Sequence, residues 1–205
     1  MKIAIIELLS SDSLQYDRHL NAYEVSAWLR CEGHCVSLSA WPTGRSFDEL
    51  FAGLTEADRV LLWDESVYVD IAATKFALGN KKLSDALDEA DVMTAACPKD
   101  QATLAVFSGG ETYAAARENL GSALVDTMVE KRAPVPCGAF GAFFVWLHTG
   151  AISRLLPDGG PVMIAGLDVS LSRRLIEGGA SVQVDPRLAV ISRLTQTVPW
   201  SLPPA

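Results

Sequence analysis

The sequence predicts an α/β fold of the Rossmann-like or flavodoxin-like kind, with a parallel sheet between two layers of helices. Short apolar runs of strand length recur along the chain, and segments of helix length separate them. The first part reads as a strand–helix–strand unit, which favours parallel pairing through a right-handed crossover. The 205 residues are 49% hydrophobic and 20% charged, which suits one well-buried core. We therefore expect a single three-layer α/β domain.

The expected strands share a short, continuous apolar pattern. They cover residues 2–8, 35–40, 59–63, 103–107, 133–136, 162–165, 181–184 and 189–192. Runs that are apolar on both faces are typical of buried parallel strands. We expect residues 2–8, 35–40, 103–107 and 133–136 to be central in the sheet.

The expected helices share apolar residues at helical spacing. They cover residues 17–30, 47–54, 112–130, 138–156 and 170–177, together with most of 64–91. Gly33 follows the first of them, where a glycine commonly ends a helix.

Charge and composition exclude several classes of partner. The formal net charge is -8 and no basic run exists, so we expect neither a nucleic-acid partner nor an anionic-membrane partner. No apolar run approaches the ~18 residues of a membrane span. The four cysteines are scattered, which is typical of a reduced cytoplasmic protein. The spacing Cys31-x3-Cys35 is read as two core thiols, and we expect no metal site.

Two strand ends carry residues that are suited to chemistry. Gly109 and Gly110 follow one expected strand, where they could let backbone N–H groups approach a ligand or an oxyanion, or form an ordinary tight turn. Cys137 lies between an expected strand and an expected helix, directly before Gly138. A helix N-terminus at that point would lower the pKa of the thiol and favour a thiolate nucleophile. A buried core cysteine is the alternative reading.

The order of strand, Gly-Gly, helix, strand, cysteine and apolar helix resembles the ThiJ/PfpI superfamily, which has the class I glutamine amidotransferase-like fold. The spacing of Gly110 and Cys137 and the late segment Leu175–Asp185 are similar to that family. The likeness covers about half of the chain, best from Thr103 onward. Pro136 and Ala139 depart from the family pattern around the cysteine.

The resemblance implies an enzyme of the hydrolase, hydratase or lyase type that acts on a small molecule. Cys137 would be its nucleophile, and Asp17 in the first helix would orient or protonate within a few ångströms of the sulfur. Gly110 and Gly138 would stabilise a developing anion through their backbone N–H groups. The family core is shorter before the Gly-Gly strand, so residues 42–99 are expected to be a helical insertion beside the cleft. His148 is expected to be a packed histidine.

Cobalamin binding is the alternative. Residues Asp17 to Ala22 resemble the Asp-x-His-x-x-Gly signature of cobalamin-binding domains, with His19 as the cobalt ligand and Ala22 in place of the glycine. Ser66 and the Gly109–Gly110 pair could supply further cobalamin contacts. A non-catalytic ligand-binding module therefore stays open beside the enzyme, for which no cofactor is expected. We also expect a two-fold homodimer, the commonest closed assembly, with an exposed Trp or Phe of the proline-rich C-terminal tail or of the 42–99 insertion in its interface.

Overall fold

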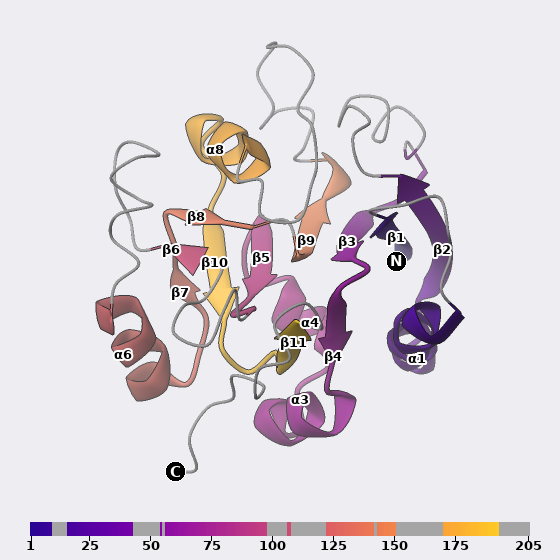
Figure 1. The fold of residues 1–205 in the computed structure, drawn as a ribbon, viewed down its shortest axis with the longest axis horizontal. Coiled ribbons are helices and arrows are strands. Elements are labelled where there is room, and N and C mark those ends of the chain that lie inside the picture. The colour runs from indigo at the N-terminus through magenta and orange to yellow at the C-terminus, as the bar shows by residue number, and fades with distance from the viewer. Residues whose placement is uncertain are drawn as a thin grey trace.

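The structure is a computed structural model of the chain. It describes residues 1–9, 16–42, 54, 56–97, 106–107, 122–141, 143–150 and 170–192, with the side chains of 16–19 and a few other residues left out (Figure 1). The fold is of the mixed α/β kind, with helices around a central sheet.

Seven strands form the central sheet in the described part of the chain, in the order β2-β1-β3-β9-β5-β10-β7. They are β1 (Lys2–Leu9), β2 (Cys35–Pro42), β3 (Arg59–Asp64), β5 (Val92–Ala95), β7 (Val135–Pro136), β9 (Phe144–His148) and β10 (Val182–Asp185). Strands β2, β1, β3, β5 and β10 run in one direction, and β9 and β7 run against them. The sheet is therefore mixed and not wholly parallel.

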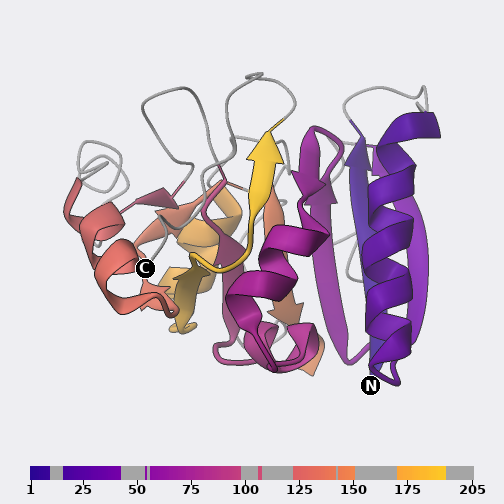
Figure 2. The same cartoon turned by 90° about the horizontal axis from the view of Figure 1, so that it is seen from below.

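Apolar side chains are buried on both faces of this sheet. The described helices are α1 (Tyr16–Cys31), α3 (Ile71–Leu78), α4 (Leu83–Leu87), α6 (Ser122–Lys131) and α8 (Ser170–Glu177). One apolar cluster joins the sheet to α1, α3 and α4, and a second cluster joins it to α6 and α8. Figure 2 shows α1, α3 and α4 together in front of the strands.

Two small antiparallel pairs accompany the central sheet. Strand β4 (Val67–Val69) pairs with β11 (Val190–Ser192), and β6 (Val106–Phe107) pairs with β8 (Ala139–Phe140). The amide of Asn21 on α1 holds β4 in place, because it donates to the Val69 carbonyl (3.0 Å) and accepts from the Val69 N–H (2.7 Å). These contacts join α1 to the chain that follows β3.

The first strand–helix–strand unit is confirmed. Strands β1 and β2 pair in parallel and α1 connects them, and Gly33 takes a positive φ of 94° two residues after that helix. Strands 59–63, 181–184 and 189–192 and the helix at 170–177 are also confirmed. The expected helix 47–54 and strand 162–165 lie almost wholly outside the described residues.

The expectation for residues 138–156 is wrong over the described part. Residues 139–140 and 144–148 form β8 and β9 in place of a helix. The aromatic and β-branched residues of Phe-Val-Trp-Leu-His pack on both faces of the sheet, which favours a buried strand. The central position expected for 35–40, 103–107 and 133–136 is also wrong, because β2 is an edge strand of the described sheet. Strand β6 lies in a separate pair, and β7 pairs antiparallel at the sheet edge.

The expectation that residues 42–99 form an insertion beside the core is wrong over the described residues. Strands β3 and β5 come from it, and both lie inside the central sheet. Over residues 54 and 56–97, which the structure describes, the segment supplies part of the core.

None of the helices that the structure describes is both long enough and apolar enough to cross a lipid bilayer.

Candidate functional site

A topological switch point lies at the carboxyl ends of β1 and β3. The chain leaves β1 through α1 to reach β2 on one side, and β3 then pairs with β1 on the other side. In open α/β sheets, ligands bind outside the carboxyl ends of the strands at the point where the strand order reverses. This edge is therefore where a ligand is expected on topological grounds.

An acidic turn closes β3 at this edge. We call residues Asp64, Glu65 and Ser66 the acidic turn. The Asp64 carboxylate accepts from the Ser66 N–H (2.9 Å) and the Ser66 hydroxyl (2.5 Å) through the same oxygen. The Glu65 N–H donates to the Leu8 carbonyl (3.0 Å), and the Asp64 N–H donates to the Phe143 carbonyl (2.8 Å). The turn is thereby fixed to β1 and to the start of β9.

Aromatic side chains support the turn from within the core. The Trp63 ring packs against Phe144 with a centroid separation of 5.6 Å, and its indole N–H donates to the Val67 carbonyl (3.1 Å). Both rings are buried. The backbone on each side of the acidic turn is therefore held by a rigid contact.

Three carboxylates are buried near this edge: Glu7, Asp64 and Glu65. Glu7 lies on β1, opposite Trp63 in register, and Leu8 is opposite Asp64. Acidic side chains are seldom buried unless a partner compensates the loss of hydration. Three buried carboxylates therefore lie near the carboxyl ends of β1 and β3.

Cys97 follows β5 at the same edge of the sheet. Burial, and then the negative charge of Asp64, raise the pKa of its thiol to about 12. Cys97 is therefore a neutral thiol at physiological pH. Because the charge of Asp64 contributes to this rise in the pKa of Cys97, the end of β5 lies within electrostatic reach of the acidic turn.

The surroundings of Cys137 do not favour a thiolate. Cys137 lies between β7 and β8, is 8% exposed and packs in the cluster beneath α6 and α8. Burial raises the pKa of its thiol to about 12. The expected helix N-terminus is absent here, because strand β8 follows directly.

The structure does not bring Asp17 and Cys137 together. Asp17 belongs to the first turn of α1, which packs on β1 and β2, and its side chain is not described. Cys137 follows β7 at the other edge of the sheet (Figure 1). The five strand-to-strand steps from β1 to β7 span about 24 Å. The expected separation of a few ångströms is therefore wrong.

The remaining predicted site residues are only partly described. Gly109 and Gly110 lie outside the described residues, as does the side chain of His19. Gly138 occupies the bend between β7 and β8 and is half-buried. Ala22 is fully buried against the sheet on α1. Within the described ranges, no group of three His, Cys, Asp or Glu side chains is arranged to hold a metal ion.

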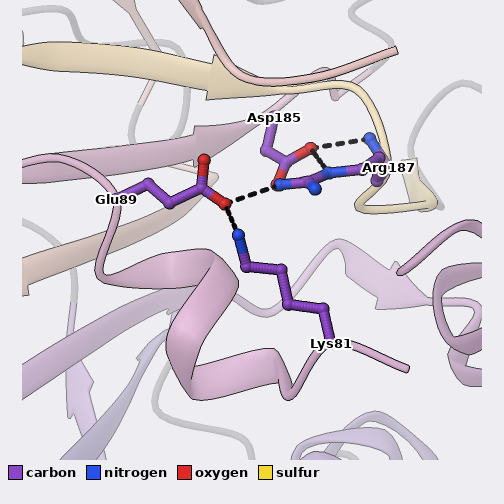
Figure 3. Close-up of polar contacts among 4 residues, drawn as sticks. All are labelled: Lys81, Glu89, Asp185 and Arg187. Carbon is purple, nitrogen blue, oxygen red and sulfur yellow. Dashed lines mark hydrogen bonds and ion pairs between the residues drawn. The ribbon is translucent and has the colours of Figure 1, made fainter. Parts of the chain in front are cut away.

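A second polar cluster ties the β10–β11 turn to α4. Arg187 binds the Asp185 carboxylate through two nitrogens (2.7 and 2.9 Å) and reaches Glu89 (3.0 Å), which also pairs with Lys81 (Figure 3). Asp185 is fully buried. Burial opposes ionisation of Glu89, but the bonds from Lys81 and Arg187 outweigh it and lower its pKa. The charged side chains of this cluster pair with one another, so we assign the cluster a structural role.

Sequence reasoning missed Glu7, Asp64 and Glu65 as site residues and named only Ser66. A usable signal was present, because Asp64 and Glu65 directly follow the apolar run 59–63. Acidic residues directly after a buried parallel strand lie at the ligand-binding edge of the sheet. Reading residues 42–99 as an insertion hid that signal.

No known protein-family profile matches the chain, and no curated protein matches its sequence. Among solved structures, A197 from STIV superposes with a TM-score of 0.49 and 10% identity, over 91% of this chain and 83% of that one. The catalytic domain of Drosophila β1,4-galactosyltransferase 7 with xylobiose gives a TM-score of 0.46 and 12% identity, over 90% and 64%. A mutant of that enzyme with manganese, UDP-Gal and xylobiose gives 0.44 and 10%, over 89% and 64%.

The chain thus spans less than two thirds of the length of the galactosyltransferase domain. None of these three structures is a ThiJ/PfpI protein. Identities and scores of this size assign neither a family nor a function to the chain.

Proposed function

We propose that this chain binds a small phosphorylated ligand of nucleotide type, together with a divalent cation, at the acidic turn. The observation that carries the proposal is the position of two buried carboxylates, Asp64 and Glu65, at the switch point between β1 and β3. The rule that ligands bind at switch points applies to sheets with helices on both faces. The two apolar clusters support that three-layer arrangement here.

The cation follows from the charges involved. A phosphate group approaching Asp64 and Glu65 meets like charge, and the chain as a whole carries -8. A divalent cation between them would turn repulsion into attraction. Mg²⁺ commonly binds through one or two carboxylates and completes its shell with water and substrate phosphates. The lack of a three-residue cluster among the described side chains is compatible with this mode of binding.

Binding of nucleotides tests the proposal. Nucleoside diphosphates and nucleotide sugars are titrated by calorimetry with Mg²⁺ or Mn²⁺ and again with EDTA. We expect binding that needs the metal and weakens about tenfold or more in Asp64→Asn and Glu65→Gln, because each change removes one anionic ligand. In Asp64→Asn the side-chain amide oxygen would still accept from Ser66, so the turn should keep its shape.

Asp126→Asn is the matched control, since Asp126 is an exposed acid on α6. It should bind as the wild type does. Binding that persists in EDTA would contradict the cation. If Asp64→Asn, Glu65→Gln and Asp126→Asn all bind the nucleotide with the wild-type affinity, the ligand does not bind at the acidic turn.

A cysteine-dependent hydrolase or lyase of the ThiJ/PfpI type remains the competing proposal, and its test is alkylation. Cys31 and Cys35 are exposed, so the reading of them as core thiols is wrong. At neutral pH, iodoacetamide should label these two first and leave the buried Cys97 and Cys137 intact, because the pKa of each buried thiol is about 12. Mass mapping checks this. Preferential labelling of Cys137 would instead favour the enzyme.

Cobalamin binding, the other competing proposal, predicts a coloured protein after purification with cobalamin. Its expected ligand, His19, lies where the side chains are not described, so absorption spectra of wild type and His19→Gln decide it. A spectrum without the cobalamin bands excludes this proposal.

A further inference from the structure

The outer face of α1 is unlike that of an ordinary surface helix. The exposed residues of its described part are Leu20, Tyr23, Glu24, Ala27, Arg30 and Cys31. Their helical spacing places them on one stripe. Only two of them are charged, and Leu20 and Tyr23 are each 58% exposed. A helix that rests on a sheet normally turns a polar face to solvent, so this stripe indicates a further partner.

Helix α3 adds a large exposed aromatic side chain to the same helical layer. Phe76 is 91% exposed. The neighbouring Lys75 places its ammonium 4.9 Å from the centre of the Trp28 ring, so α3 lies against α1. Figure 2 shows both helices on one side of the sheet. The exposed Phe76 is therefore carried by a helix that neighbours α1 on the same side of the sheet.

We propose that the outer face of α1, extended by Phe76, binds a second copy of this chain across a two-fold axis at Ala27. The two α1 helices would pack antiparallel. The small side chain of Ala27 allows close approach at the crossing. Closed two-fold dimers are the commonest assembly, and they bury the same surface on both partners.

The charges on the stripe fit a second copy. Glu24 lies three residues before Ala27 and Arg30 lies three residues after it. In the antiparallel arrangement, Glu24 therefore faces Arg30 of the partner subunit, and the same pair occurs again across the axis. Tyr23 faces Cys31 of the partner subunit by the same relation. A stripe with opposite charges placed symmetrically about a small residue is complementary to itself.

Both charged groups also contact their own chain. Glu24 accepts from the Asn21 amide (3.2 Å), and Arg30 donates to the Val36 carbonyl (2.9 Å). A carboxylate accepts several hydrogen bonds and a guanidinium has five N–H donors, so each group has capacity left for a partner. The local contacts hold the two charges in fixed positions on the helix surface.

Charge reversal tests the arrangement. Light scattering with size exclusion should report twice the 22.0 kDa chain mass at high concentration and dissociation on dilution. Glu24→Arg should weaken the dimer about tenfold, because it places like charges together, and Glu24→Arg with Arg30→Glu should restore it. Glu130→Arg, an exposed change on α6, should leave the dimer unchanged. A monomer at all concentrations, or no rescue by the double variant, would overturn the proposal.

Disulfide trapping tests the register. In a Cys35→Ser background, Tyr23→Cys should form an intermolecular disulfide with Cys31 under mild oxidation by diamide. The product should disappear when Cys31→Ser is added. Glu130→Cys in the same Cys35→Ser background is the control, because its intermolecular disulfide would form only through random collisions. Trapping no faster than this control would overturn the antiparallel pairing about Ala27.

Discussion

His148 shows how one side chain can make stability depend on pH. It ends β9 opposite Arg59, which begins β3. Asp88 holds Arg59 (2.8 Å) and the Trp146 indole (2.7 Å), and its carboxylate lies 3.5 Å from His148 Nε2. Burial, followed by the charge of Arg59, lowers the pKa of His148 against the opposing effect of Asp88 and Asp91. The neutral ring is thus the form that the fold prefers.

The pH dependence follows from that direction. Above pH ~6.5, the usual pKa of histidine, the ring is neutral in both the folded and the unfolded chain and costs nothing. As the pH falls below this value, the unfolded chain takes up the proton first, so the free energy of unfolding decreases. We expect His148→Gln to lose less stability than the wild type between about pH 6.5 and 5.

Urea denaturation at several pH values checks this expectation. At neutral and mildly alkaline pH the two proteins should differ by a constant amount, since the histidine ring does not titrate there. An unchanged slope of stability against pH in His148→Gln would assign the acid sensitivity to other groups.

At the scale of elements, side chains connect segments that are far apart in the sequence. Glu32 follows α1 and accepts from the Leu83 and Ser84 N–H groups (2.7 and 3.0 Å), so it caps α4 in place of a local residue. Asp70 caps α3 through the Ala73 N–H (2.9 Å). Arg187 ties the turn after β10 to the end of α4 through Glu89. Short helices that have little stability alone are held in this way.

The Arg187 contact should matter most for stability. Arg187→Met keeps the aliphatic stem but leaves the fully buried Asp185 carboxylate without its cation, so we expect a loss of about 3–5 kcal/mol in the free energy of unfolding. Urea denaturation measures it.

Lys81→Met is the matched control. It removes the partly exposed partner of Glu89 and should cost about 1 kcal/mol or less. Asp185→Asn combined with Arg187→Met should recover part of the loss, because no buried charge remains. A cost of Arg187→Met no larger than that of the control would contradict the argument.

At the scale of the whole molecule, local pattern predicted the parallel unit of β1, α1 and β2, because its elements are neighbours in the sequence. It failed at residues 144–148, since an apolar run of that length suits a buried helix as well as a buried strand. Residues 144–148 form a strand because they pair with β3 and β5, and these contacts exist only in the folded chain. The expectation of a helix after Cys137 failed for the same reason, because strand β8 takes its place.

The position of β9 between β3 and β5 has a consequence for synthesis of the chain on the ribosome. Strands β1, β2 and β3 can pair as soon as they emerge, but β3 and β5 share no ladder and each must wait for β9. Until then the nascent chain presents unpaired apolar strand edges, which are prone to join other chains. We expect folding of the central sheet to be completed late in translation, and the waiting intermediate to be the form that chaperones bind.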